Sequence, residues 1–564
     1  MKSISGFSFL LAGALLGCRE ESVSPLGTGH LQLGFANATA VCGALNSVRI
    51  RLLGGGVNIT EDIAPGTSKT FGDLRPGSYT VRAEGYIGGD VDCYGETTVT
   101  VAVGPPTQAT ITAIALGVGT VSPLSAVNLG REMAVTFSKV ASVTQYLVQW
   151  DRTAAFSTPT DVVWSDTTGT VQVPDSGLFY IRVRAKDPYG TNGRASSPVS
   201  TFVDPVTTVS VGWFHTCAVT KSGAAYCWGE NPYGGLGDSS TTLRARPVRV
   251  KLPPGIRLGQ VVTGKGFSCG LAASGGDAYC WGVNDYGQLG LSSFSQMSLV
   301  PAKVVGNHAF TTISTHTSFH VCGVTSTGTY CWGRDNFGEL GNGTPGDSTA
   351  APTLVLGGHS FDSVSVGYFF TCSLEAGAGY CWGNNIPGRL GTGDSTHQTV
   401  PTQMATAVNF SQVSTGTFHG CASTSAGELY CWGSGGNGAL GHGDFSNALA
   451  PQKVQNSGTV LSFSAVSAGA NYTCGLVSSG QSAYCWGTND NGELGIGTSG
   501  SAINSPTPVQ GQHRFVNISA GYFHTCAVDV VGAVYCWGDN TNGALGNGTT
   551  NSQPVLTPTR VVNP

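Results

Sequence analysis

The sequence has 564 residues, of which 83 are glycine and only 10% are charged, whereas an average soluble domain has about 25% charged residues. Its formal net charge is −5 at pH 7, and from residue 205 onward 13 Lys and Arg stand against 16 Asp and Glu without a basic run. The length allows three or four domains, and the lack of a positive stripe to neutralise phosphates predicts no nucleic-acid partner.

Residues 1–18 are predicted to be an export signal. Lys2 precedes an apolar run that is too short to span a bilayer, and the end of this run, Leu15-Leu16-Gly17-Cys18, resembles the bacterial lipobox. The resemblance implies lipid on the Cys18 thiol and cleavage before Cys18; the alternative is an ordinary signal peptide with an incidental cysteine. Since no second spanning run follows, we expect a bacterial cell-envelope protein, on the outer membrane, the surface or the periplasmic side, attached by lipid alone.

Two β-sandwiches are predicted after a flexible tether at residues 19–29. Residues 30–116 alternate apolar and polar positions in short runs such as "SVRIRLL", and "LRPGSYTVRAEG" resembles prealbumin-like surface modules. Cys42 and Cys93 are available to form a disulfide within this domain. Residues 117–204 resemble a fibronectin type III domain, with "YLVQWD" around Trp150 as a central strand and a closing hairpin after Gly177. Both modules are interpreted as spacers.

From residue 205 to 564 the sequence repeats. Tyr-Cys-Trp-Gly occurs seven times at intervals of 50 to 54 residues, and each copy is followed by a variant of "NxxGxLG" and by a segment that contains proline. This series resembles the repeats of the regulator of chromosome condensation family. The resemblance implies an all-β fold in which seven repeats close into a β-propeller of four-stranded blades.

Each repeat can also be interpreted without the family. In the last copy, "RFVNISA", "TCAVD" and "VYCWG" predict the first three strands of an antiparallel sheet, and "PTRVV" after a long loop predicts the fourth. A single sheet cannot bury both faces, so neighbouring sheets must stack. We therefore expect the tryptophan of every Tyr-Cys-Trp-Gly to pack between blades.

A second cysteine precedes each Tyr-Cys-Trp-Gly by 9 to 11 residues, with a turn between the two. Opposed residues of an antiparallel pair lie close enough for a disulfide, whereas zinc ligands usually come in shorter cysteine pairs. The predicted disulfide cysteines are Cys217, Cys227, Cys269, Cys280, Cys322, Cys331, Cys372, Cys381, Cys421, Cys431, Cys474, Cys485, Cys526 and Cys536, together with Cys42 and Cys93. With lipid on Cys18, all 17 cysteines have a role, which suits an oxidising compartment.

The blade topology predicts where a partner binds, because the connections after the first and third strands share one face. The bends after the first strands read "GWFH", "GKGF", "TSFH", "GYFF", "GTFH", "GANY" and "GYFH". The candidate binding residues on this face are Trp213, Tyr233, Tyr286, Phe337, Tyr368 and Tyr522. By contrast, we expect the bend residues Phe214, Phe369, Phe418 and Phe523 to point inward and pack between blades.

No catalytic residues, metal ligands or cofactors are predicted. His215, His320, His419 and His524 share a position at which other blades carry Phe267, Phe370 and Tyr472, so the position requires a flat ring rather than an imidazole. Serine-elbow, zinc-helix and phosphate-loop motifs are missing from the sequence. Loops rich in Asp and Asn suggest calcium as an alternative, but turns use the same residues.

The predicted function is binding by a monomeric, lipid-anchored protein through one propeller face, without enzymatic activity. The partner would be a protein or a polysaccharide. Inhibition of a hydrolase is one version, because secreted bacterial relatives of the family inhibit hydrolases. The alternative is a structural or adhesion component of the envelope. Guanine-nucleotide exchange, which the family resemblance also implies, conflicts with export. The resemblance to plant ultraviolet receptors is limited to "GWFHT", where Phe214 takes the place of an arginine.

Overall fold

The computed structural model describes residues 15–21, 29–34, 46–54, 57–64, 68–74, 77–87, 90–101, 109–112, 114–115, 121, 127–140, 143–188, 190–294, 297–455 and 461–564. These residues form two compact units, of which the second comprises residues 203–564 with 127–132 and 174–176. The fold is all-β, as predicted. Within the described residues we find no helix of the length and apolarity needed to cross a membrane.

The first part of the chain forms two sheets with the strand orders β5-β2-β1-β8 and β4-β3-β6-β7-β9. Alternate residues of the second sheet are buried, for example Val48, Ile50 and Leu52, as expected for strands that cover a core on one face. The strands are β1 (Leu15–Glu21), β2 (Gly29–Gly34), β3 (Ser47–Gly54), β4 (Val57–Ile63), β5 (Ser68–Leu74), β6 (Gly77–Ile87), β7 (Asp90–Val101), β8 (Ala109–Thr112) and β9 (Ile114–Ala115).

Strand β1 differs from the predicted tether. Residues 18–21, which include the first three residues of the segment predicted to be flexible, pair with residues 30–33 of β2. A mature chain that begins at Cys18 would keep these pairs, but it would lose the pairs that Leu15, Leu16 and Gly17 make with residues 110–112 of β8. Cys93 is buried on β7 and is disulfide-bonded. Its predicted partner, Cys42, lies outside the described residues, so this pairing stays a prediction.

The next part, within the predicted range 117–204, also has two sheets, ordered β10-β16-β15-β12-β13 and β11-β14. "YLVQWD" lies in β12, between two other strands, and the ring of Trp150 meets that of Phe179 edge-on at 5.4 Å. The strands are β10 (Val127–Asn128), β11 (Glu132–Thr136), β12 (Gln145–Asp151), β13 (Thr160–Trp164), β14 (Thr168–Gln172), β15 (Gly177–Lys186) and β16 (Val199–Val203).

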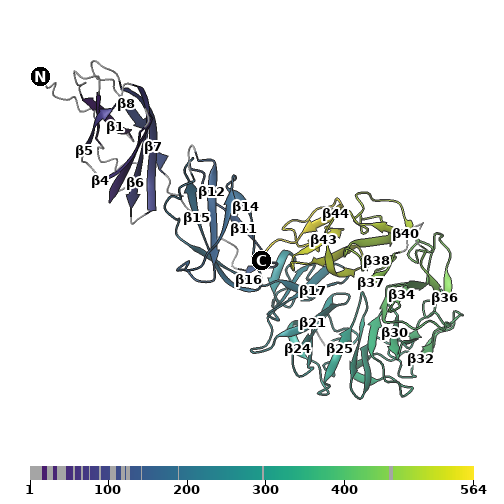
Figure 1. The fold of residues 1–564 in the computed structure, drawn as a ribbon. Helices are drawn as coiled ribbons and strands as arrows, with labels where there is room; N and C mark the ends of the chain where they lie inside the picture. Colours follow the sequence, from purple (N-terminus) through teal and green to yellow (C-terminus); the bar gives the residue numbers. More distant parts are fainter. Residues whose placement is uncertain are drawn as a thin grey trace, which may run out of the picture. The chain divides into compact units, whose positions relative to one another are not determined.

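Seven four-stranded antiparallel sheets follow in chain order and form a ring of blades (Figure 1). Strand β17 of the first blade contacts β41 and β42 of the last. The strands are β17 (Val206–Val211), β18 (His215–Thr220), β19 (Ala225–Gly229), β20 (Arg244–Arg249), β21 (Leu258–Thr263), β22 (Phe267–Ala272), β23 (Ala278–Gly282), β24 (Ser298–Lys303), β25 (Phe310–Ser314), β26 (His320–Thr325), β27 (Gly328–Gly333), β28 (Thr349–Leu354), β29 (Ser363–Val366), β30 (Phe370–Glu375), β31 (Ala378–Gly383), β32 (Gln398–Gln403), β33 (Gln412–Thr415), β34 (His419–Ser423), β35 (Leu429–Gly433), β36 (Ala448–Lys453), β37 (Phe463–Ala468), β38 (Tyr472–Val477), β39 (Ala483–Gly487), β40 (Ile503–Pro508), β41 (Phe515–Ala520), β42 (His524–Asp529), β43 (Val534–Gly538) and β44 (Val555–Arg560).

Tryptophan side chains join each blade to the one before it, as the sequence predicted. All seven are fully buried, and each indole N–H donates to the backbone carbonyl just before the Leu of "NxxGxLG" in the preceding blade. Trp228 closes the ring by donating to the carbonyl of Ala544 at 2.8 Å. The repeat therefore encodes a joint between blades as well as the blade itself.

The first strands of the blades add a second set of links. Serine hydroxyls on these strands accept hydrogen bonds from the backbone N–H of the next blade's first strand, and Val211 N–H donates to Ser519 Oγ at 3.0 Å to join the first blade to the last. The serines are Ser210, Ser314, Ser365, Ser414, Ser467 and Ser519. The blades are therefore held at the ring's inner strands and at their tryptophans.

All seven predicted cysteine pairs within blades are bonded in the structure. Each pair is directly opposed across the second and third strands, with Cα atoms 4.1 Å apart, as for Cys217 and Cys227. By loop-closure entropy each bridge contributes about 2 to 3 kcal/mol to the stability of the blade.

The fourth strands begin earlier than predicted. Proline was expected at the start of this strand, but in β44 Pro558 is preceded by three strand residues, and the other six blades have proline at the same place. The fourth strand is the outer edge of each sheet, where a missing N–H costs no ladder hydrogen bond and discourages pairing with another chain.

Candidate functional site

The bends after the first strands and the loops after the third strands lie on one side of the propeller, because successive strands of each blade are antiparallel. We call this side the loop face and the other side the turn face. The bends occupy residues 212–214, 264–266, 315–319, 367–369, 416–418, 469–471 and 521–523. Each bend ends at the ring residue that begins the second strand, such as His215 or Phe267.

Aromatic side chains from several blades meet on the loop face. The ring centroid of Trp213 lies 4.2 Å from that of Tyr522 and 5.9 Å from that of Tyr368. Further ring contacts link Tyr368 to Phe369 and Phe319, Phe369 to Phe337, Phe319 to Tyr286, and Phe214 to Trp213 and Phe523. We call these nine residues the aromatic cluster. It contains five of the six predicted binding residues, and the sixth, Tyr233, lines a pocket beside it.

Four bend phenylalanines are less buried than predicted. Phe214, Phe369, Phe418 and Phe523 are half-buried on the loop face, as are Trp213, Tyr368 and Tyr522. Contacts with neighbouring blades do occur there, since Phe214 stacks on Phe523 of the last blade and Phe369 meets Phe337 of the third. The following residue, for example His215, begins the strand and is the one buried in the joint. Because side chains alternate along a strand from its first residue, a shift of one position in the expected strand start exchanged buried and surface rings.

Trp213 is held by the bend of the third blade. This bend is one residue longer than the others, counted from the serine of the first strand to the ring residue, and its Thr317 has a φ of 48°. The carbonyl of Thr317 accepts from the Trp213 indole N–H at 2.7 Å. On the same bend, the His316 Nε2–H donates to the carbonyl of Ala520 in the last blade at 2.6 Å. These bonds fix the aromatic cluster before any partner arrives.

Two cations lie among the rings, and neither was singled out from the sequence. The Lys265 Nζ lies 3.7 Å from the Trp213 ring centroid and 5.1 Å from that of Phe319. Arg334 is buried, pairs with Glu339 at 3.1 Å and donates to the carbonyl of Tyr368 at 2.6 Å. Burial lowers the pKa of Lys265, and the positive charge of Arg334 lowers it further. The "GKGF" bend, which departs from the other six, was the available signal for Lys265.

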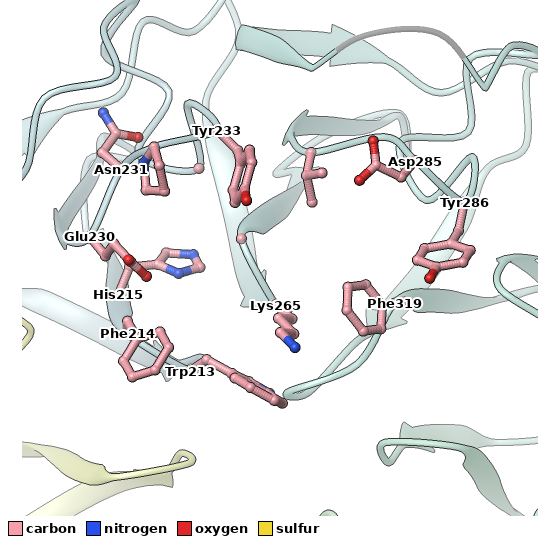
Figure 2. A pocket seen from close by; sticks show the side chains of 14 residues that line it. Trp213, Phe214, His215, Glu230, Asn231, Tyr233, Lys265, Asp285, Tyr286 and Phe319 are labelled. Atoms are coloured by element: carbon pink, nitrogen blue, oxygen red, sulfur yellow. The ribbon is translucent and has the colours of Figure 1, made fainter.

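A pocket of about 390 Å³ lies between the first two blades and is bordered by the bend of the third (Figure 2). Glu230 and His215 lie on one side of it, Tyr286 and Phe319 lie on the other, and Lys265 and Trp213 lie between them. Burial raises the pKa of Glu230. Three of the predicted binding residues, Trp213, Tyr233 and Tyr286, line this pocket.

The four histidines at the shared position serve the joints. In each, the imidazole Nε2 lies 2.8 to 2.9 Å from a Ser or Thr hydroxyl of the next blade. That hydroxyl donates to the carbonyl that also accepts from tryptophan, so the imidazole Nε2–H must be the donor. Burial lowers the pKa of His215 to about 4 and that of His419 and His524 to about 3.

The position requires more than a flat ring. His215 faces Ser268 and His320 faces Thr371, whereas the blades that carry Phe267 and Phe370 are followed by Val321 and Gly420, which have no hydroxyl. Polar rings therefore meet hydroxyl groups and apolar rings meet residues without one, so the expectation from the sequence was incomplete.

The Asn and Asp side chains of the long loops bind their own backbone. Asn231 is an example: its Oδ1 accepts from Leu236 N–H and its Nδ2 donates to the carbonyl of Ser240. Such bonds are the turn-forming role that the sequence left open beside calcium. Within the described part of the chain, no group of three His, Cys, Asp or Glu side chains is arranged to hold a metal ion.

Comparisons with known proteins agree with this architecture. Residues 182–474 match the RCC1-like domain, and residues 482–528 and 531–564 match the regulator of chromosome condensation (RCC1) repeat. Over 354 residues the chain is 31% identical to the ultraviolet-B receptor UVR8 of Arabidopsis thaliana. This alignment covers 61% of this chain and 67% of the receptor. Over 155 residues it is 30% identical to the E3 ubiquitin-protein ligase HERC2 of Homo sapiens, in an alignment that covers 27% of this chain and 3% of the ligase.

Solved structures show the same fold. Prp20p from Saccharomyces cerevisiae superposes with a TM-score of 0.54 at 21% identity, over 64% of this chain and 88% of that chain. Human WBSCR16 superposes with a TM-score of 0.51 at 19% identity, over 68% of this chain and 99% of that chain.

Proposed function

Because this chain belongs to the family of proteins with the RCC1-like domain, we propose that it is a binding protein of the bacterial cell envelope that recognises another protein through its loop face. The aromatic cluster carries this proposal. Large rings in a half-buried surface are the residues that dominate binding energy at protein interfaces, and pre-formed positions reduce the entropy lost on binding. Trp213 and Tyr368 are held by hydrogen bonds to and from the third blade.

Prp20p, which has this fold, binds Gsp1p and histones, so a propeller of this fold can bind proteins. Few charges surround the aromatic cluster here, and Arg334 is already paired with Glu339. The proposed partner therefore binds mainly by apolar contact, with weak dependence on salt. Inhibition of a hydrolase would be one form of such binding.

We propose binding without catalysis. The four aligned histidines form joints between blades, and low pKa values keep the imidazoles of His215, His419 and His524 neutral near pH 7. Attachment through lipid on Cys18 is part of the proposal and rests on the resemblance to the lipobox. In a detergent phase-separation assay, Cys18→Ser should move the protein out of the detergent phase; unchanged partitioning would contradict the anchor.

The experiment that tests the binding function captures proteins from the envelope fraction of the producing cells with the purified full chain. A partner identified by mass spectrometry is then titrated against Tyr368→Ala and, as a control on the turn face, Lys221→Ala. We expect Tyr368→Ala to weaken binding by about 2 kcal/mol or more and Lys221→Ala to change it little. Equal affinities of the two variants, or stimulated nucleotide exchange on a GTPase, would contradict the proposal.

A further inference from the structure

At the pocket between the first two blades, the bend of the second blade lacks the ring that most other bends carry. Five of the seven bends carry phenylalanine immediately before the buried ring residue, at Phe214, Phe319, Phe369, Phe418 and Phe523. The second blade has Gly266 there, with a φ of 75°, and a Cβ atom at this glycine would lie 3.2 Å from the Tyr233 ring. The Tyr233 ring lies against this glycine, and both line the pocket (Figure 2).

A carboxylate and an ammonium group line this pocket but do not form an ion pair with each other. Glu230 contributes a carboxylate and Lys265 an ammonium group, both half-buried, and neither has a hydrogen-bond or ion-pair partner among the described residues. The Trp213 and Phe319 rings contact the Lys265 ammonium but supply no oxygen acceptor to its N–H groups. A ligand that brings a donor to Glu230 and an acceptor to Lys265 would therefore satisfy both groups. Asp285 adds a second acceptor at the rim.

Six of the 14 residues that line the pocket carry aromatic rings. Tyr233 and Tyr286 add hydroxyl groups to its walls, and Tyr233 is 50% exposed, which leaves a ring face open to contact by a ligand. An ion of either sign would be attracted by one of Glu230 and Lys265 and repelled by the other. A neutral ligand with several hydroxyl groups avoids this conflict, because each hydroxyl both donates and accepts.

We propose that this pocket binds a neutral sugar unit of a glycan, with Glu230 accepting from its hydroxyl groups, Lys265 donating to them and the Tyr233 ring packing against the C–H face of the sugar. The volume of about 390 Å³ falls within the range of small-molecule sites. The pocket opens on the loop face and shares Trp213, Phe214, Tyr286 and Phe319 with the aromatic cluster. The three residues that carry this proposal, Glu230, Lys265 and Tyr233, are not among the nine cluster residues, so the two proposals can be tested with different variants.

The test uses the purified full chain and neutral disaccharides of hexoses and N-acetylhexosamines: maltose, cellobiose, lactose and N,N′-diacetylchitobiose. Isothermal titration calorimetry measures binding at 50 and 500 mM NaCl for the unmodified protein, Tyr233→Ala and Glu230→Gln. Phe445→Ala is the matched control. The exposed fraction of Phe445, 49%, is similar to that of Tyr233, and Phe445 also follows a third strand on the loop face, but it does not line the pocket.

We expect at least one disaccharide to bind, with affinity unchanged by salt, reduced at least tenfold by Tyr233→Ala and by Glu230→Gln, and changed less than twofold by Phe445→Ala. Thermal unfolding of each variant verifies that it is folded. Absence of binding by all four sugars at millimolar concentration would overturn the proposal, as would binding that ignores both pocket variants. Salt-sensitive binding of glycine or of a zwitterionic dipeptide in place of any sugar would also overturn it. Capture of a protein partner has no bearing on these outcomes, so failure of either proposal can be recognised separately.

Discussion

The joints between blades and the aromatic cluster beside them are built from neighbouring residues of the same repeat, yet the joints recur in every blade and the cluster does not. Every joint has a buried tryptophan that donates to the same backbone carbonyl of the preceding blade. The residue two positions before the buried ring residue, such as His215, differs from blade to blade. In chain order these residues are Trp213, Lys265, Ser318, Tyr368, Thr417, Ala470 and Tyr522. Closing the ring constrains the tryptophan position, whereas the bend position can vary from blade to blade.

Breaking a joint should have the largest effect on stability. Trp537 is fully buried between the sixth and seventh blades and donates to the carbonyl of Glu493 at 2.8 Å. Trp537→Ala should lower the free energy of unfolding by about 3 to 5 kcal/mol, through a cavity and the loss of this bond. Denaturant unfolding of the full chain followed by circular dichroism measures the change; a loss below about 1 kcal/mol would contradict the role given to the joints.

The third blade offers a smaller, pH-dependent effect. Asp335 occupies the position at which five other blades have Asn, whose Nδ2 donates to a backbone carbonyl nine residues later. The Asp335 Oδ1 keeps the bond from Leu340 N–H, but its Oδ2 can replace the Asn donor only when protonated. Burial raises the pKa of Asp335 from 3.8 to about 7, with Glu339 adding to the shift and the Leu340 N–H opposing it.

Because the folded-state pKa of Asp335 lies above that of the unfolded chain, the folded state holds the proton between about pH 4 and 7, and its contribution to stability is lost as the pH rises through this range. Asp335→Asn supplies the donor at all pH values. It should raise the free energy of unfolding by about 1 to 3 kcal/mol at pH 8 and by less at pH 4. A gain that is equal at both pH values would show that Asp335 does not titrate as described.

Exchanging one kind of joint for the other should have a still smaller effect. His215→Phe alone leaves the Ser268 hydroxyl without its imidazole donor, whereas the double variant His215→Phe/Ser268→Val copies the pairing of Phe267 with Val321. We expect the second change to recover about 1 kcal/mol of what the first one costs. A double-mutant cycle measured by denaturant unfolding gives this coupling, and a coupling of zero would reject the pairing rule.

The repeats made the propeller and its joints predictable from the sequence. Seven copies of Tyr-Cys-Trp-Gly with a cysteine 9 to 11 residues earlier fix strand pairing, so the opposed cysteines and buried tryptophans follow from spacing alone. The six binding residues were chosen from the face that this topology defines. The structure joins five of them in one cluster and places Tyr233 in the pocket beside it, although their role in binding stays a prediction.

The remaining features depend on single departures from the repeat. The extra residue in the third bend lets Thr317 reach Trp213, and Gly266 places no ring beside Tyr233. Both departures are visible when the bends are aligned, but their consequence depends on contacts between blades distant in sequence. From the sequence we expected Phe214 to be the buried ring, but His215 is the buried one. The second strand begins one residue earlier than expected, and the spacing of the repeats alone does not show this.

The most direct test of the contrast between joint and surface compares two aromatic residues of the last blade, Tyr522 on the loop face and Trp537 in the joint. The measurement is affinity for the protein captured from the envelope fraction, taken together with the unfolding midpoint of each alanine variant. Tyr522→Ala should lose at least tenfold in affinity while its midpoint stays close to that of the unmodified chain, and Trp537→Ala should unfold early but bind normally where it is still folded. The account would be contradicted if Tyr522→Ala bound the partner normally and had a lowered unfolding midpoint.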